Sequence, residues 1–350
     1  MARSLFLHLA VAAVAALPAP SAAQAKPPAA PPDLAALDAG LEELSRRVAP
    51  SVVQVTALGY ASAPGTLLAR AEASGSGVVV DPEGWIVTNA HVVENARRVQ
   101  VDLMPPRTEA GGSILRPRSR RLPARVIGLD SETDVAVLKV DLAGLPALPF
   151  GDSEALHQGQ LVLAFGSPLG LENSASLGVV SAVARQVEPD DPMIYVQTDA
   201  SINPGNSGGP LVDSAGRMVG LNTAILSRSG GSEGIGLAAP GNIVRSVYEQ
   251  IRKTGRVRRG VIGVRAQTIT APLAAGLSLG SDRGVVLSDV LPGGPGAAAG
   301  LRTGDVVVAL DGKPMENARQ LDVNLYRRAP GETVTLAVRR GQEKVDVAVT

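Results

Sequence analysis

Short runs of β-branched and apolar residues, separated by turns rich in glycine and proline, fill the chain from residue 51 to residue 239. Many such runs in succession indicate an all-β sandwich or barrel. Six runs come before residue 141 and six after residue 159: 51–58, 75–80, 85–88, 98–103, 122–129 and 134–140, then 160–165, 175–185, 193–197, 210–212, 217–223 and 235–239. The sequence therefore predicts a mainly β fold in which each group of six forms one antiparallel barrel.

A second, smaller module is predicted to follow a closing helix. The helix is expected from Asn242 to about Gly255, because Ile243, Val247 and Ile251 fall on one stripe at helical spacing. The basic segment 253–259 is then more typical of a solvated linker than of a nucleic-acid patch. From residue 260 onward the module is expected to open with a β segment at 261–264, followed by a strand at 284–290 and a short helix at 297–301. A strand from 304 should then end in the Asp-Gly turn at 311–312. A capped helix at 318–328 and a hairpin over 331–349 complete the expected elements.

The segment 205–210 reads GNSGGP and places a serine among glycines. A serine attacks a carbonyl effectively when a base takes its proton and when hydrogen-bond donors stabilise the oxyanion. Gly205 has no Cβ, so the backbone there can turn tightly and direct N–H groups inward. The expected donors are the backbone N–H groups of Gly205 and Ser207. Taken alone, the segment is equally typical of a glycine-rich turn.

Two histidines are candidates for the base, once His8 in the apolar N-terminal segment is set aside. His91 follows a β-branched run, within the sequence WIVTNAHVV at 85–93. His157 lies in a polar stretch that closes on a glycine, which is typical of a surface turn. We therefore take His91 as the candidate base; a core histidine bonded to backbone is the alternative at that position.

Three aspartates are candidates for the acid that orients the imidazole. Asp130 and Asp134 precede the apolar run 135–140, and Asp199 precedes the serine segment. A carboxylate at the mouth of a buried strand can accept the Nδ1–H of a histidine and fix its tautomer. Spacing alone does not choose among the three. The order histidine, aspartate, serine along the chain matches that of chymotrypsin.

Three segments occur in a fixed order along the chain: TNAHV at 88–92, TDVAVLK at 133–139 and GNSGGPL at 205–211. Together they resemble the active-site signatures of the HtrA/Deg family, chymotrypsin-fold serine endopeptidases that carry PDZ domains. The resemblance implies His91 as general base, Asp134 as its orienting acid and Ser207 as nucleophile. It also implies a chymotrypsin-like double barrel over 41–252, with the active site between the barrels, and a circularly permuted PDZ domain over 260–350.

The same resemblance implies two places where a peptide binds. PDZ domains add a peptide as an extra strand and hold its C-terminal carboxylate on backbone N–H groups. The resemblance assigns that loop to Val261, Ile262, Gly263 and Val264; an ordinary strand start is the alternative. It further implies a homotrimer that acts on unfolded polypeptides.

The residues after the serine strand are the candidate wall of the primary specificity pocket. They are Asn222, Thr223, Ala224 and Ile225. The wall carries no acid, so we expect a small aliphatic residue before the cleaved bond rather than lysine or arginine.

Two features depart from the family pattern. The connection from Met104 to Arg121 is longer than the usual short turn and is rich in arginine and proline, which is typical of a solvated loop. The sequence also contains a single PDZ module, which argues against the cage-forming members that have two.

Composition excludes several other classes of function. Lysine plus arginine equals aspartate plus glutamate, 33 each, so no bulk charge favours nucleic acid as a partner. Aromatic residues make up only 2% of the chain, too few to favour base stacking. The chain has no cysteine, which excludes disulfides and thiolate metal sites. Zinc and phosphate-loop motifs are also missing from the sequence, so we expect neither a metal nor a cofactor.

The first 25 residues are typical of a secretory signal peptide. Arg3 supplies the positive charge, residues 5–17 are mainly apolar, and the sequence AQA at 23–25 fits a cleavage site. A Pro/Ala-rich tether is expected over 26–40. Export without cysteines suits the bacterial periplasm. The alternative is an uncleaved membrane anchor, although the apolar run is short against the ~20 residues of a membrane span.

These observations predict a periplasmic, ATP-independent serine endopeptidase that degrades unfolded or damaged proteins and recognises peptide C-termini through its PDZ domain. Two alternatives are a membrane-anchored regulatory protease of the same family and a chaperone or scaffold with little proteolysis.

Overall fold

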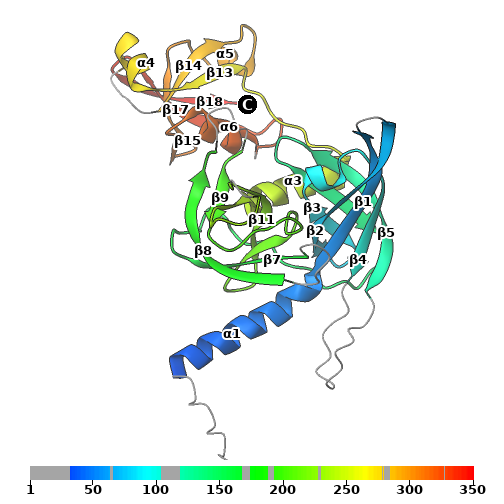
Figure 1. Ribbon diagram of the computed structural model, residues 1–350. Coiled ribbons are helices and arrows are strands. Elements are labelled where there is room, and N and C mark those ends of the chain that lie inside the picture. Colours follow the sequence, from blue (N-terminus) through cyan, green and yellow to red (C-terminus); the bar gives the residue numbers. More distant parts are fainter. Residues whose placement is uncertain are drawn as a thin grey trace, which may run out of the picture. The chain divides into compact units, whose positions relative to one another are not determined.

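The computed structural model describes residues 32–63, 66–103, 119–167, 174–187, 193–227, 230–277, 279, 284–326 and 328–350. The predicted export signal and most of the predicted loop 104–121 lie outside these residues. The chain divides into two compact units, residues 1–41 and 42–350. In the described chain, the first unit is the start of one helix, and the second contains two β-barrels and a smaller sheet with helices (Figure 1).

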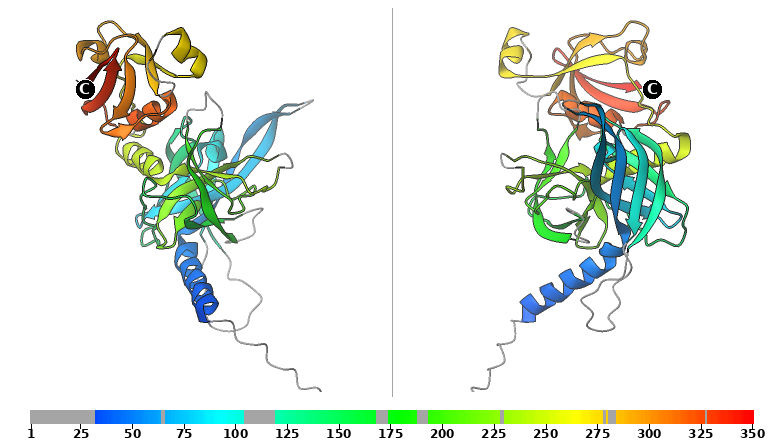
Figure 2. Two further views of the ribbon diagram at one scale, coloured as in Figure 1. Left: turned by 90° about the vertical axis from the view of Figure 1, so that its left-hand side faces the viewer. Right: turned by 45° about the vertical axis from the view of Figure 1, so that its right-hand side comes forward.

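The first barrel consists of six antiparallel strands that close on themselves in the order β1-β2-β3-β6-β5-β4. The strands are β1 (Val52–Ala63), β2 (Thr66–Asp81), β3 (Trp85–Thr88), β4 (Ala96–Leu103), β5 (Arg120–Asp130) and β6 (Val135–Val140). Alternate side chains point inward, and Val55, Ile86 and Leu138 are fully buried in the core that they form. Figure 2 shows these strands, coloured from blue through cyan to turquoise, wrapping around that interior.

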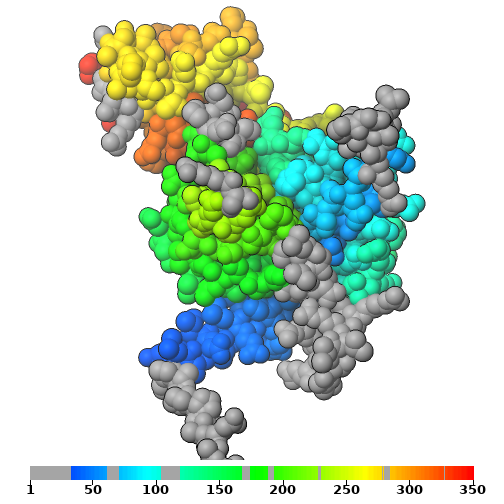
Figure 3. All heavy atoms as spheres, viewed as in Figure 1, coloured from blue at the N-terminus to red at the C-terminus, as the bar shows by residue number. Residues whose placement is uncertain are grey.

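The second barrel has the same number of strands, in the order β10-β11-β12-β9-β8-β7. The strands are β7 (Leu161–Gly166), β8 (Ser174–Arg185), β9 (Tyr195–Thr198), β10 (Pro210–Asp213), β11 (Met218–Ile225) and β12 (Gly236–Pro240). Its core contains Val162, Leu211 and Val219. The prediction that each group of six runs forms one antiparallel barrel is confirmed, and the all-atom view shows the two barrels in contact (Figure 3).

The helix α3 (Gly241–Thr254) packs across both barrels, against β5 and β6 of the first and β11 and β12 of the second. Its buried face contains Ile243, Val247 and Ile251, as the periodicity predicted. The helix ends at Gly255, whose φ of 75° is left-handed and lets its N–H donate to the Ile251 carbonyl at 2.8 Å.

The smaller domain has one sheet in the order β13-β14-β15-β17-β18, with β16 paired to β15. Its elements are β13 (Val264–Thr268), α4 (Ala271–Gly276), β14 (Val285–Val290), α5 (Pro295–Ala298), β15 (Val306–Leu310), β16 (Lys313–Pro314), α6 (Ala318–Tyr326), β17 (Val334–Arg340) and β18 (Glu343–Val349). Leu287, Leu321 and Leu336 are fully buried in its core. Asp311 and Gly312 both have positive φ, 47° and 78°, as the predicted two-residue turn requires.

The N-terminal helix and helix α5 differ from the prediction. The N-terminal helix α1 (Pro32–Val48) includes residues 32–40, so the part of the predicted tether from Pro32 onward is helical. Alanine and leucine are strong helix formers, and proline is well suited to the first helical position. Helix α5 starts at Pro295 and ends at Ala298, earlier than the predicted 297–301. Its early start has the same cause, because Pro295 takes the first helical position. A short 3₁₀ turn, Ala49–Ser51, joins α1 to β1.

We expect Ile251→Ala to destabilise the double barrel by ~2–5 kcal/mol, because a fully buried isoleucine leaves a cavity when truncated. Urea unfolding followed by the fluorescence of Trp85 measures this, since the Trp85 ring lies 5.1 Å from the Arg252 guanidinium on the same helix. The matched control is Lys253→Ala, an exposed position two residues further on, which should change stability by no more than ~0.5 kcal/mol. Equal effects of the two substitutions would contradict the packing role of α3.

Candidate active site

His91 lies in a one-turn helix, α2 (Ala90–Val93), that follows strand β3 almost directly. Asn89 precedes the helix with an extended backbone, and its side-chain amide donates to the Asp134 carbonyl at 2.8 Å. The N–H of Ala90 donates to the same carbonyl at 3.1 Å. These two hydrogen bonds hold the start of α2 against the start of β6, and they bring His91 to Asp134.

The carboxylate of Asp134 holds His91 with both of its oxygens. Oδ1 accepts the backbone N–H of His91 at 2.9 Å, and Oδ2 accepts the ring Nδ1–H at 2.6 Å. Because an ionised carboxylate only accepts hydrogen bonds, the neutral imidazole carries its proton on Nδ1 and leaves Nε2 as the basic nitrogen. Asp134 itself has a φ of 54°, a conformation in which aspartate is several-fold enriched among non-glycine residues.

The pKa of His91 is raised above its ordinary value of 6.5. The main cause is the hydrogen bond to the Asp134 carboxylate; partial burial of the ring acts in the opposite direction, and the charges of Asp134 and Glu94 add smaller increases. The side chain is 49% exposed, so the imidazole remains open to solvent on the side that does not face Asp134.

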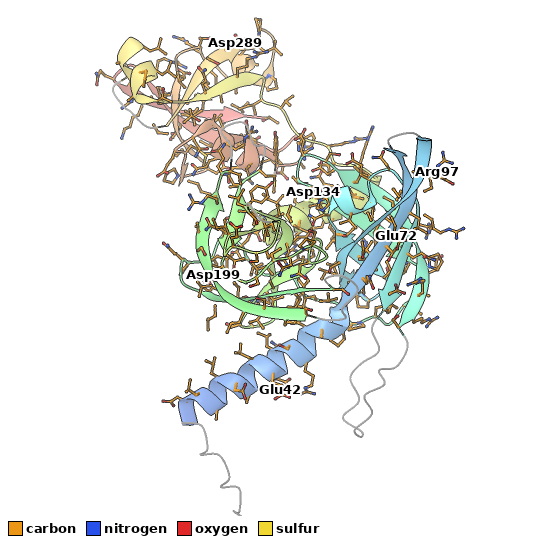
Figure 4. The ribbon with its side chains drawn as sticks, viewed as in Figure 1. Glu42, Glu72, Arg97, Asp134, Asp199 and Asp289 are labelled. Atoms are coloured by element: carbon orange, nitrogen blue, oxygen red, sulfur yellow. The ribbon has the colours of Figure 1, made fainter. Side chains whose placement is uncertain are left out.

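The other two aspartates and the other described histidine lie elsewhere. Asp130 accepts the N–H and the hydroxyl hydrogen of Thr133 and pairs with Arg259. Asp199 accepts a backbone N–H from β8, on the second barrel, whereas Asp134 belongs to the first (Figure 4). His157 is exposed in a turn. Of the three candidate aspartates, Asp134 is therefore the one whose carboxylate contacts His91.

The serine segment lies directly against the first barrel. The N–H of Ser76 in β2 donates to the carbonyl of Ser207 at 2.8 Å. Gly208 has a φ of 85°, and a Cβ there would overlap the carbonyl oxygen of Ser76. A Cβ on Gly75 would lie 3.0 Å from the Ser207 carbonyl oxygen and 2.8 Å from Val92, the residue after His91. Glycine at these positions lets the two barrels approach closely enough to bring Ser207 beside α2.

The hydroxyl of Ser207 donates to the carbonyl of Thr223 at 3.4 Å. In this structure His91 and Ser207 make no hydrogen bond to each other. Thr223 also bonds to the first barrel, because the Asn89 side-chain amide donates to the Thr223 hydroxyl at 3.1 Å. The histidine and serine segments are thus joined through Thr223 on β11.

The two N–H groups expected to bind an oxyanion take no part in the hydrogen bonds of the loop. Within the described part of the chain, the N–H groups of Gly205 and Ser207 have no acceptor. By contrast, backbone carbonyls accept the neighbouring N–H groups of Asn206, Gly208 and Gly209. Gly205 has a φ of 101°, which an L-residue with a side chain rarely adopts.

The four residues predicted to line the specificity pocket differ in exposure. Asn222 is fully buried, and its side-chain amide donates to the carbonyls of β7 and β10 residues. Thr223 is nearly buried, with its hydroxyl donating to the Leu221 carbonyl. Ala224 is exposed and Ile225 half-buried. Of the four, only Ala224 and Ile225 therefore have side chains open to solvent.

In the smaller domain, Val261, Ile262 and Gly263 precede β13 and have N–H groups without an acceptor among the residues that the structure covers. Gly263 has a φ of 68°. Val261 is 78% exposed, and Val264 starts the strand. A groove of about 350 Å³ opens beside them, lined by residues 260–265 and, from α6, by Leu321, Asp322, Leu325 and Tyr326.

Ser76, Thr88 and Asn89 were not predicted as site residues, although their polar groups support the serine and histidine segments. The signal for Ser76 is its place between two glycines in a β run, since glycine in a strand marks close backbone approach. Across the described ranges, no group of three or more His, Asp or Glu side chains is arranged to hold a metal ion.

We expect Asp134→Asn to lower the pKa of His91, because the substitution removes both the charge and the charge-assisted hydrogen bond that raise it. NMR titration of the imidazole signals measures the change, with His157→Gln used to assign them. Glu94→Gln is the matched control, since it removes a charge near His91 without touching the hydrogen bond; its effect should have the same sign and be smaller. An unchanged His91 pKa in Asp134→Asn would contradict the pairing.

Two sequence profiles match the chain: "Trypsin-like peptidase domain" over residues 75–221 and "PDZ domain" over residues 260–350. The probable periplasmic serine endoprotease DegP-like of Halomonas elongata is 41% identical over 276 residues, which cover 79% of this chain and 56% of that protein. The protein of the same name from Chlamydia muridarum is 40% identical over 277 residues, 79% of this chain and 53% of that protein. The chain thus spans little more than half the length of these curated relatives.

Solved structures show the same relationship. The HtrA-type protease AlgW with a decapeptide superimposes with a TM-score of 0.67 at 35% identity, covering 88% of this chain and 97% of that one. The serine endoprotease from Yersinia pestis gives a TM-score of 0.56 at 31% identity, covering 88% and 96%. Taken together with the two closed barrels and the PDZ profile, these matches show that the chain belongs to the HtrA family of trypsin-like serine proteases with a PDZ domain.

Proposed function

We propose that this chain is a periplasmic, ATP-independent serine endopeptidase that degrades unfolded proteins, with His91, Asp134 and Ser207 as its catalytic residues. The observation that carries the proposal is the 2.6 Å pair of His91 Nδ1 with Asp134 Oδ2, held beside a serine loop whose Gly205 and Ser207 N–H groups have no acceptor in the described chain. A base with a fixed tautomer, a nucleophile and free oxyanion donors are the parts that acyl transfer requires.

The chemistry follows from these groups. Nε2 of His91 takes the proton of Ser207 as its Oγ attacks the peptide carbonyl, and returns that proton to the leaving amine. Asp134 keeps the ring in the required tautomer and stabilises the imidazolium ion. The N–H groups of Gly205 and Ser207 hold the oxyanion of the tetrahedral intermediate. Water then attacks the acyl-enzyme by the same route. Because the pKa of His91 is raised and the base must be neutral, kcat/KM falls as the pH drops through a value above 6.5.

One step must precede catalysis in this scheme. The hydroxyl of Ser207 donates to the Thr223 carbonyl at 3.4 Å, so the side chain has to turn from Thr223 toward His91 before it can attack. A 3.4 Å hydrogen bond is long for a hydroxyl donor, and rotation about one χ angle costs little. Rotation of the Ser207 side chain away from Thr223 is therefore the step that we propose to precede attack.

We expect the wild-type chain to digest casein and Ser207→Ala to lose nearly all turnover, by a factor on the order of 10⁶ as in other serine proteases without their nucleophile. Gel assays measure digestion, and a fluorophosphonate probe should label the wild type only. Ser214→Ala is the matched control, because this serine is exposed in the turn between β10 and β11. Mass spectrometry of the products should place the cuts after small aliphatic residues. A chain that folds but leaves casein intact would favour the chaperone or scaffold alternative.

For the PDZ domain we propose that the loop Val261-Ile262-Gly263-Val264 binds the C-terminal carboxylate of a peptide. Support comes from the three consecutive free N–H groups at 261–263 and from the groove between this loop and α6. A carboxylate on such donors needs no cationic side chain. The related HtrA-type protease AlgW has been solved with a decapeptide.

We expect a peptide with a free, apolar C-terminus to bind the full chain, and the same peptide with a C-terminal amide to bind at least tenfold more weakly, because the amide loses the charge that the N–H groups stabilise. Fluorescence anisotropy of a labelled peptide, using Ser207→Ala to prevent cleavage, measures both. Equal affinity of the acid and the amide would contradict carboxylate capture by this loop.

Location and assembly complete the proposal. The relatives are named periplasmic, and residues 1–25 have the features of a signal peptide. Within the described ranges, no helix combines the length and the apolar content needed to cross a membrane. We propose export to the periplasm and a homotrimer, in which the PDZ domain regulates proteolysis; the membrane-anchored protease remains the alternative for the N-terminus.

A further inference from the structure

Ser76 lies at the contact between the two barrels, and each of its polar groups makes a hydrogen bond: the N–H, the carbonyl and the hydroxyl. It lies in β2 of the first barrel and is fully buried. Its N–H donates to the Ser207 carbonyl at 2.8 Å, and its own carbonyl accepts the Thr88 hydroxyl at 2.7 Å. Its hydroxyl bonds to Gly205 and to Ser167, both on the second barrel's side of the contact.

The direction of the Ser76 hydroxyl is fixed by its two partners. The N–H of Ser167 donates to the oxygen at 2.8 Å. A hydroxyl has one proton to give, and the Ser76 Oγ–H gives it to the Gly205 carbonyl at 2.6 Å. Both partners are backbone groups, so neither bond depends on the rotamer of another side chain.

These bonds fix the peptide unit between Gly205 and Asn206. Its carbonyl is held by Ser76 at 2.6 Å, and its N–H donates to the Asn203 carbonyl at 2.9 Å. A peptide unit held at both edges cannot rotate about its own axis without breaking a buried hydrogen bond. It lies between the two free N–H groups of Gly205 and Ser207, and its orientation sets the angle between them.

We propose that Ser76 is a positioning residue for the oxyanion loop, defined as residues 205–207. It acts through the Gly205 carbonyl, holding the two N–H donors where the developing oxyanion will form. The inference rests on the proposed function of Ser207 and goes beyond it, since it assigns part of the preorganisation of this loop to a side chain of the other barrel. Preorganised donors stabilise the transition state more than the bound substrate.

The test is Ser76→Ala in the full chain, assayed with a chromogenic peptide and with a peptide boronic acid, which forms a tetrahedral adduct like the intermediate. We expect kcat to fall roughly tenfold, because the variant loses the hydroxyl's bond to the Gly205 carbonyl together with the bond it accepts from Ser167. This is less than the ~10²–10³ caused by deleting an oxyanion donor. KM should stay within about twofold, because ground-state binding is untouched. Affinity for the boronic acid should fall in step with kcat.

The matched control is Thr198→Val in the second barrel. Thr198 is also fully buried, donates its hydroxyl to a backbone carbonyl at 2.8 Å and accepts one backbone N–H at 3.1 Å. Its partners, Val179 and Ala200, lie outside the oxyanion loop and the His91–Asp134 pair. Thr198→Val should lower the melting temperature about as much as Ser76→Ala and leave kcat unchanged. Ser76→Cys, with a side chain of similar shape and a weaker donor, should fall between wild type and Ser76→Ala, and it replaces Ser76→Ala if that variant does not fold.

Each outcome separates this inference from the proposed function. If the wild type has no Ser207-dependent cleavage, the proposed function fails first. If the wild type cleaves and a folded Ser76 variant keeps its kcat, the positioning role is wrong. The role is also wrong if Thr198→Val loses as much kcat as Ser76→Ala for the same loss of melting temperature, since the effect would then be general destabilisation.

Discussion

The contact between β2 and the serine segment is the constraint on which the rest of the site depends. Backbone groups of Ser76 and Ser207 meet at 2.8 Å, which is possible only because Gly75 and Gly208 have no Cβ to hold the strands apart. Each buried polar group in this contact would cost ~1–3 kcal/mol if it were left without a partner. The two barrels therefore pair their backbone groups here in one register, and that register places the backbone of Ser207 beside α2. An interface made of side chains alone would tolerate sliding; one made of paired N–H and carbonyl groups does not.

Asp134 shows how local strain is balanced at the same place. A residue with a side chain held at positive φ costs of the order of 1–3 kcal/mol, and Asp134 has a φ of 54°. In return, its carbonyl receives two hydrogen bonds from the start of α2, and its carboxylate receives two from His91. The strained conformation of Asp134 thus directs both its carbonyl and its carboxylate toward the short helix α2. Removing the carboxylate would leave only the two bonds to the Asp134 carbonyl to offset the strain.

The sequence specified the strands well, because hydrophobic alternation and glycine turns are local properties. It placed both barrels, α3 and its end at Gly255, and the Asp-Gly turn of the PDZ domain. It also singled out His91, Ser207 and a short list of acids. It did not distinguish Asp130 from Asp134 by spacing, since both precede the same strand and only the turn between them decides which carboxylate faces the histidine. Ser76 escaped notice because its partners are backbone groups more than 90 positions away along the chain. The direction of the Ser207 hydroxyl, toward Thr223, depends on one χ angle that no pattern encodes.

Both peptide sites of the proposed function use backbone N–H groups rather than charged side chains to meet a negative oxygen. At one, Gly205 has a φ of 101° and leaves two N–H groups free; at the other, Gly263 has a φ of 68° and leaves three. Backbone donors are fixed by the fold, so they cost little reorganisation when an anion arrives. They also contact no side chain of the substrate, which suits the proposed action on unfolded proteins. As a consequence, groups outside these loops must orient the N–H donors. At residues 205–207 the hydroxyl of Ser76 does this, and Ser76 belongs to the barrel that also carries His91.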